Sequence, residues 1–392
     1  MRPDRNGPDR KDPGRAYDFN LPITTHHSPL TYWTMLEPMK FVRPIVIAGL
    51  SVFLTGCNGV GYYWQSVNGQ LAMWSRERPV ADVISDPATD EALRRKLLRV
   101  QRIRDFASRE LKLPDNASYR SYADLGRPFA VWNVFAAPEF SVSPVQWCFP
   151  VAGCVAYRGY FEQSAAERFS AGLAAQGKDV YVGGVPAYST LGYFADPLLN
   201  TFIRFPDVEI ARLLFHELSH QVAYAPDDTV FNESFAVAVE TEGVKRWVAS
   251  TADQAALADF ERRKRAREEF QRIVTRCRER LHALYRSGVP PDAMRSRKAA
   301  ILQQMTDEYR ASRDRVGFAG YDRWFAQRPN NAQVVSVAIY TQLVPEFQAL
   351  LNNEGGDLGR FYARVKALAG LPKDERADAL RKAVLRAQRA AR

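Results

Sequence analysis

The sequence predicts an α+β fold that is predominantly helical, with a small mixed β-sheet in its first half. Long segments with helical apolar spacing fill the chain after Thr251. Short runs of β-branched and aromatic residues, bounded by turn residues, are confined to residues 118–185. A composition of 46% hydrophobic and 25% charged residues over 392 positions is that of a folded protein with a substantial core.

The chain begins with an extension followed by the layout of a secretory signal. Residues 1–34 are rich in Pro, Arg and Asp, so the extension over residues 1–38 is predicted to be disordered. Alternatively, the true start of the protein is Met35 or Met39. Residues 39–57 then give a basic start and an apolar run that is too short to span a bilayer. The run ends in Leu54-Thr55-Gly56-Cys57, which resembles a bacterial lipobox.

The lipobox resemblance implies that cleavage makes Cys57 the new N-terminus and that lipid on Cys57 holds the protein to a membrane. The residue after Cys57 is Asn58 and not Asp. By analogy with enteric bacteria, this implies that the lipoprotein lies on the periplasmic face of the outer membrane of a bacterial cell envelope. An uncleaved N-terminal anchor is the alternative interpretation of the same residues.

The formal net charge of +10 raises the question of a nucleic-acid partner. No nucleic-acid motif accompanies it, and the Arg residues are spread along amphipathic segments together with Glu and Asp. We therefore expect no nucleic-acid partner. The charge indicates a solvated face first and attraction to anionic lipid head groups second.

Residues 58–250 are expected to form the core that carries the candidate site. Apolar spacing predicts helix over 61–113 and again near 163–175. Strands are predicted at 119–125, 130–136, 145–151, 154–160 and 179–182. Cys148 and Cys154 flank a turn sequence between two of these strands, so they form either a disulfide or two buried free thiols.

Residues 251–392 are expected to form a helical C-terminal region. Pro290 and Pro291 separate the first predicted helix from the second. The predicted helices are 253–286, 291–312, 333–352, 359–368 and 374–391. Cys277 falls inside the first of these helices and is expected to be a core residue.

One short segment carries ligand chemistry: His216-Glu217-Leu218-Ser219-His220. On a helix, residues four apart share a face, so both imidazoles can bind one metal ion. Imidazoles suit Zn²⁺, and a catalytic zinc takes three protein ligands and leaves one position for water. Glu217 is placed to take a proton from that water. The chain has five His, so the pair is specific, although two hydrogen-bonded, partly buried His are the alternative.

A second helix is expected to complete this site. Residues 224–229 include a proline and break the first helix, so the next helix folds back beside it. In such a hairpin Glu233, one turn after the loop, meets His220, one turn before it, and supplies the third ligand. Glu240 lies about two turns further on and is expected to accept a hydrogen bond from a ligand imidazole. Asn232 is expected at the helix start or beside the ligands, not as a ligand.

HELSHQ at 216–221 and NESFAVAVE at 232–240 resemble the HExxH and NExFAxxxE pair of gluzincin zinc aminopeptidases, the aminopeptidase N type. The chain is more closely similar to bacterial lipoproteins predicted to be zinc aminopeptidases, through GGVPAYSTLG at 183–192, FHELSHQ, Asp227-Asp228-Thr229 and NESFA. This resemblance runs from about Gly61 to the last helices. Unlike aminopeptidase N, the chain has a shorter stretch between the second His and the Glu, and it lacks the Gly-x-Met-Glu-Asn segment that holds a substrate's amino end.

The resemblance implies further site residues. In gluzincins an edge strand before the HExxH helix pairs with substrate, which implies that Gly183 and Gly184 let a peptide approach. An ordinary strand-to-loop turn is the alternative. A downstream Tyr of gluzincins donates a hydrogen bond to the oxyanion. Tyr340 is the candidate for that role, and Tyr188, in the expected substrate-binding segment, is its rival; either could instead be a core aromatic.

Together these features predict a zinc metallopeptidase with one Zn²⁺ ion and a peptide substrate, held in the envelope by lipid. The small sheet is expected beside the gluzincin-like helix. That the enzyme is an aminopeptidase and not an endopeptidase rests on the resemblance alone. The remaining alternative is a non-catalytic envelope lipoprotein with a structural or relic metal site. Glu217 argues against it, since a structural site needs no base.

Overall fold

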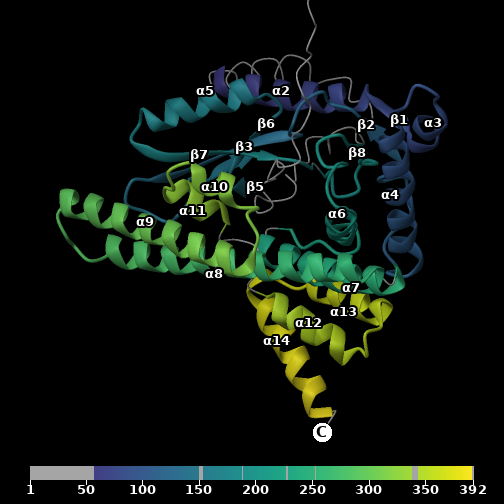
Figure 1. Ribbon diagram of the computed structural model, residues 1–392. Helices are drawn as coiled ribbons and strands as arrows, with labels where there is room; N and C mark the ends of the chain where they lie inside the picture. Colours follow the sequence, from purple (N-terminus) through teal and green to yellow (C-terminus); the bar gives the residue numbers. More distant parts are fainter. Residues whose placement is uncertain are drawn as a thin grey trace, which may run out of the picture.

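The computed structural model describes residues 57–149, 153–187, 189–226, 228–251, 253–337 and 343–390. The predicted fold class is confirmed, because helices predominate and the strands form small sheets of two or three (Figure 1). Residues 1–56, Tyr188 and Tyr340 lie outside the described residues. The secretory signal and both oxyanion candidates therefore stay predictions.

The segment predicted as helix over 61–113 contains three helices and one short strand. These are α2 (Cys57–Trp74), β1 (Glu77–Pro79), α3 (Val80–Ser85) and α4 (Glu91–Arg109). The Asp90 carboxylate caps α4 by accepting hydrogen bonds from the backbone N–H groups of Ala92 and Leu93. The buried face of α4, which includes Leu97 and Ile103, packs against α6 (Asp207–His220).

Two three-stranded sheets lie in the first half of the chain. In the mixed sheet, β2 (Ser121–Ala123) pairs antiparallel with β1 and parallel with β8 (Leu198–Leu199). In the antiparallel sheet, β3 (Val131–Pro138) lies between β6 (Arg158–Tyr160) and β7 (Lys178–Val185). One face of β3 packs with α5 (Gln163–Ala174), while Phe135 and Tyr181 belong to a buried cluster with residues of two later helices, α8 (Gln254–Tyr285) and α9 (Pro291–Val316). The edge strand β7 therefore leads along the chain toward α6.

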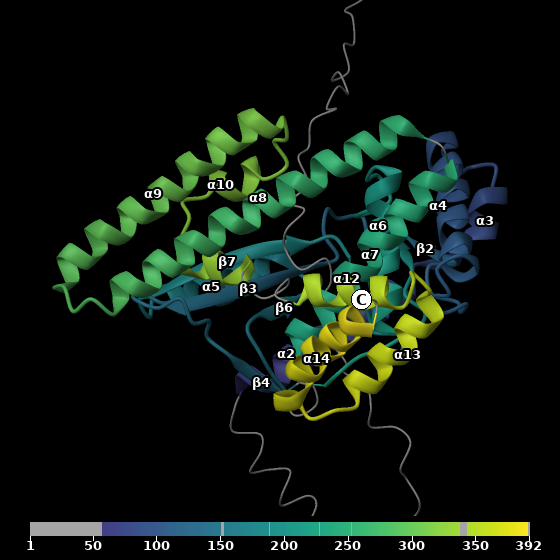
Figure 2. The ribbon, with the colours of Figure 1, turned by 90° about the horizontal axis from the view of Figure 1, so that it is seen from below.

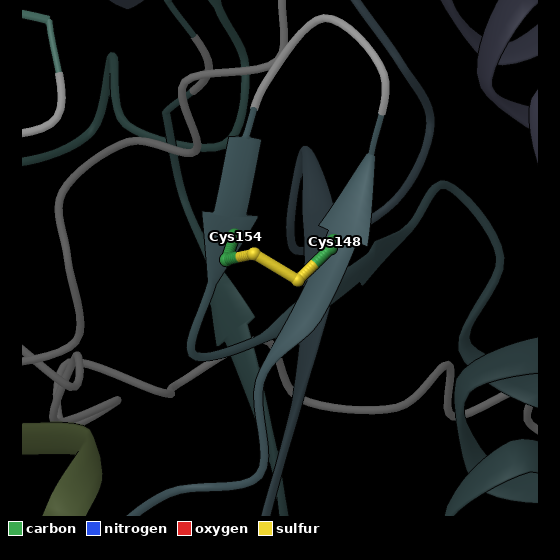
Figure 3. The surroundings of a disulfide bond; sticks show 2 residues. All are labelled: Cys148 and Cys154. Atoms are coloured by element: carbon green, nitrogen blue, oxygen red, sulfur yellow. A yellow bond between two sulfur atoms is a disulfide. The ribbon is translucent and has the colours of Figure 1, made fainter.

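The strand predicted over 154–160 is two strands, because β5 (Gly153–Val155) belongs to a separate hairpin with β4 (Trp147–Phe149). Cys148 and Cys154 face each other across this hairpin and form a disulfide, with an S–S distance of 1.99 Å (Figure 3). The hairpin is thus closed covalently. Cys277 is a buried free cysteine in α8.

The second half of the described chain is helical. After α7 (Thr229–Thr251), the helices α8 (Gln254–Tyr285) and α9 (Pro291–Val316) form a long antiparallel hairpin (Figure 2). The helix predicted over 333–352 is α11 (Asn331–Val337) and α12 (Val344–Asn353), because Pro345 is tolerated in the first turn of a new helix but not in a helix interior. The remaining helices are α10 (Asp322–Ala326), α13 (Leu358–Ala369) and α14 (Lys373–Ala390).

The main hydrophobic core joins the two halves of the chain. Phe215 of α6 and Phe235 of α7 belong to the same buried cluster as Phe347 of α12 and Phe361 of α13. Residues before and after position 250 therefore contribute to one hydrophobic cluster. Among the residues that the structure describes, none of the helices has the length and apolarity needed to cross a bilayer.

Candidate metal centre

α6 is a buried helix with a stripe of polar side chains. All of its residues from Val208 to His220 are buried. Polar residues recur on one face at intervals of three and four, at Glu209, Arg212, His216 and His220. Burial of such groups is costly unless they are paired, so this stripe requires partners from neighbouring helices.

The loop between α6 and α7 is held by side chains of α7 and the residue before it. The side-chain amide of Asn232 donates to the carbonyl of Ala225 (2.8 Å) and accepts from the N–H of Ala225 (2.7 Å). The Asp228 carboxylate accepts from the N–H of Phe231 (3.1 Å) and so caps α7. These bonds close the hairpin near the candidate ligands His220 and Glu233. Asn232 thus lies near the start of α7 and holds the backbone of the loop.

The hairpin brings His216, His220 and Glu233 together. Nε2 of His216 lies 3.3 Å from Oε2 of Glu233, and Nε2 of His220 lies 3.7 Å from Oε1 of the same carboxylate. One potential ligand atom from each residue lies within 4.8 Å of the other two. The two imidazole rings are 4.9 Å apart and nearly perpendicular. Two nitrogens and one carboxylate oxygen therefore converge on one point.

Glu240 binds the other nitrogen of His216. Its Oε2 lies 2.9 Å from Nδ1 of His216 and 3.2 Å from Nη1 of Arg212. Arg212 Nε also donates to Glu209 (2.9 Å), which lies 3.8 Å from Arg267 of α8. Sequence reasoning placed Glu240 but missed Arg212, Glu209 and Arg267. Arg212 and Glu209 lie on the same helix face as the two histidines, and this spacing was the signal that could have identified them. No such signal exists for Arg267.

The carboxylates of this cluster favour positive charge at His216. Burial lowers the pKa of His216, but hydrogen bonds to Glu233 and Glu240 and the charge of Glu217 raise it to about 10. Burial raises the pKa of Glu240, yet Arg212 and His216 hold it below its usual range. A strongly raised imidazole pKa means that the surrounding carboxylates stabilise a cation at this position.

Glu217 is fully buried and interacts electrostatically with a second polar cluster. Burial, together with the charge of Glu217, raises the pKa of Asp196 to about 7. The Asp196 carboxylate accepts hydrogen bonds from Ser189 Oγ (3.3 Å) and from the N–H of Thr190 (3.0 Å). The backbone carbonyl of Asp196 accepts from the N–H of Tyr119 (2.6 Å), a buried residue in a left-handed conformation (φ 65°). Sequence reasoning missed Asp196 and Tyr119, although Ser189 and Thr190 belong to the GGVPAYSTLG segment.

An exposed tyrosine lies next to the second histidine. The Tyr224 ring is 6.2 Å from that of His220 and nearly perpendicular to it, and the residue is 40% exposed. Because the candidate ligands His216, His220 and Glu233 are buried, Tyr224 marks a side of the site that solvent reaches. Sequence reasoning did not single out Tyr224, since its only signal is its place in the loop between the two helices.

Gly183 and Gly184 lie in β7, opposite Asn133 and Trp132 of β3. A Cβ built on Gly184 would overlap with the ring of Phe129, so this glycine is needed for close packing of that ring. β7 is an edge strand of its sheet within the described residues. The role of both glycines in substrate binding stays a prediction.

Fold and site together define a predominantly helical α+β protein with a candidate metal centre on an antiparallel helix hairpin. The model of the family described as "Putative aminopeptidase" matches residues 61–380, more than half of the chain, and the chain belongs to that family. No curated protein and no solved structure matches the chain. Membership of this family supports a peptidase activity.

Proposed function

We propose that the protein is a zinc metallopeptidase that removes residues from the amino end of peptides. The observation that carries the proposal is the convergence of His216, His220 and Glu233, with Glu217 following the first histidine on the same helix. Membership of an aminopeptidase family supports the choice of peptide substrates.

The residues present fit a zinc ion. Two imidazole nitrogens and one carboxylate oxygen are a usual ligand set for catalytic zinc, and three protein ligands leave a position for water. The raised pKa of His216, to about 10, reflects a site that attracts positive charge, which a dication would supply in place of a proton. Glu240 binds Nδ1 of His216 and leaves Nε2 on the side of Glu233.

Each residue of the site then has a specific role. When bound, zinc would act as a Lewis acid that lowers the pKa of water and polarises a carbonyl. Glu217 accepts the proton of the attacking water and passes it to the leaving amine. Glu240 accepts the Nδ1–H of His216 and fixes the orientation of the ring, and Arg212 holds Glu240 in place.

We place this activity in the bacterial cell envelope, with lipid on Cys57. The support is the order of basic start, apolar run and Leu54-Thr55-Gly56-Cys57. The Cys148–Cys154 disulfide also fits, since disulfides persist in oxidising compartments such as the periplasm.

The test is metal analysis of the purified protein combined with digestion of paired peptides that carry free or acetylated amino ends. We expect bound zinc, stepwise loss of residues from free amino ends, and inactivation by a chelator that added zinc reverses. Internal cleavage of the acetylated peptides would show that the protein is an endopeptidase and not an aminopeptidase. A zinc-loaded protein that cleaves neither set would support the non-catalytic lipoprotein.

A further inference from the structure

One face of α2 is packed firmly against the protein. Tyr62, Ser66, Gln70 and Met73, at intervals of four, four and three, are all buried. A Cβ built on Gly69, on the same side of the helix, would overlap with the ring of Phe161. The rotation of α2 about its axis is therefore fixed by close packing.

The opposite face of α2 is uncharged, mostly apolar and largely exposed. Trp64 is 67% exposed and Leu71 is 51% exposed, with Val67 partly exposed and Asn68 exposed between them. We call these four residues the outer face of α2. Trp64 has the largest exposed fraction among the large hydrophobic side chains of the described residues.

α2 also carries no charge. None of its 18 residues is Asp, Glu, Lys or Arg, in a chain in which 25% of residues are charged. A helix with one face in water ordinarily carries charged residues on that face. An uncharged helix with an exposed Trp has instead the composition of a surface that contacts the region between lipid head groups and acyl chains, which aromatic rings favour.

The place of α2 in the chain identifies that contact. The helix begins at Cys57, the residue at which lipid is proposed. Seven residues of helix, roughly 10 Å, separate Cys57 from Trp64. An acyl chain on Cys57 would thus keep the outer face within about one head-group layer of the bilayer, with no linker in which the protein could turn away.

We propose that the outer face of α2 lies in the interfacial region of a phospholipid bilayer and sets the orientation of the protein on the membrane. The inference rests on the proposed envelope location. It places α2 and α5 next to the membrane and directs the C-terminal helices away from it, since α14 lies at the opposite end of the molecule (Figure 1).

The test is fluorescence quenching of the mature full-length protein in vesicles of phosphatidylethanolamine and phosphatidylglycerol that contain spin-labelled phosphatidylcholine. Trp64→Phe removes one of the six tryptophans in residues 57–392, the chain that remains after cleavage. We expect a quenched component in the unaltered protein that Trp64→Phe abolishes. As a matched control, Leu385→Trp in the Trp64→Phe protein puts a tryptophan at a 55% exposed position of α14 and should not restore quenching.

Intact-mass analysis of the same preparation separates the two proposals. Equal quenching with and without Trp64, or no quenching in a lipidated protein, overturns the contact of α2 but not the anchor. Quenching of Trp64 in a protein without lipid supports the contact and overturns the anchor. A protein that is neither lipidated nor quenched overturns both.

Discussion

The carboxylate of Glu240 lies 2.9 Å from Nδ1 of His216. The carboxylate of Glu233, seven residues earlier on the same helix, faces Nε2 of the same ring. Glu233 and Glu240 lie two helical turns apart on α7 and so contact opposite sides of one imidazole. Arg212, at 3.2 Å, holds Glu240 from α6. The hairpin thereby fixes which nitrogen of His216 is available to a metal.

Glu217→Gln should retain zinc and fold normally while losing peptidase activity by about two to four orders of magnitude, because an amide cannot accept a proton. The measurement is peptide turnover at matched zinc content, with thermal unfolding as the control for folding. Undiminished turnover by the Gln protein would show that another group is the base.

Glu233→Ala should abolish zinc retention, whereas Glu240→Ala should weaken zinc affinity by about ten- to a hundredfold, because Glu233 faces both Nε2 atoms and Glu240 faces Nδ1 of His216. Zinc content after dialysis against a graded chelator distinguishes the two. A metal-free Glu240→Ala protein beside a metal-replete Glu233→Ala protein would reverse their roles.

Arg212→Met should lower the free energy of unfolding by about 3–5 kcal/mol, because it leaves the carboxylates of Glu209 and Glu240 buried with less compensation. Adding Glu240→Gln to this variant should recover part of the loss, since one of the uncompensated charges is then removed. Denaturant unfolding of the single and double variants gives the interaction free energy between Arg212 and Glu240. Strictly additive losses would mean that Arg212 does not act through Glu240.

The stability of the protein should depend on pH through Asp196. Its pKa in the folded protein is about 7, against an ordinary value of 3.8, with burial as the main cause. A raised carboxyl pKa contributes stability that is fully present below the unfolded pKa and is lost as the pH rises through about 7. Relative to Asp196→Asn, the unaltered protein should therefore lose on the order of 4 kcal/mol between pH 4 and pH 8, roughly 1.4 kcal/mol per pKa unit.

The comparison is made by chemical unfolding of both proteins across this pH range, so that the titrating groups that do not interact with Asp196 cancel. The sign is the critical result. A difference that is constant with pH, or that grows in favour of the unaltered protein as the pH rises, would contradict the assignment.

Export should remove residues 1–56 and leave lipid on Cys57. Intact-mass analysis of the membrane fraction measures both. Cys57→Ala should abolish lipidation, while Cys277→Ala, which alters a buried cysteine of α8, should leave it unchanged. An unprocessed N-terminus, or lipid on the Cys57→Ala protein, would rule this out.

The sequence alone determined what depends on local spacing. Residues four apart on one helix must share a face, so the spacing of His216 and His220 is enough to predict that they act as a pair. A short proline-containing loop forces the next helix back, which brings Glu233 toward His220 and leaves Glu240 two turns away. The predominance of helix followed from apolar periodicity, but this periodicity did not show where one helix ends and the next begins, as between α2, α3 and α4 and at the proline in the first turn of α12.

Tertiary structure alone decided which distant groups meet. Asp196 and Tyr119 come near Glu217 through a loop and a turn far apart in the sequence, and Arg267 reaches Glu209 from α8. Helical spacing places a side chain on a face but does not say which other element covers that face. That choice depends on how the buried surfaces of the whole chain pack together, which is why the charges that support His216 were visible in the sequence only in part.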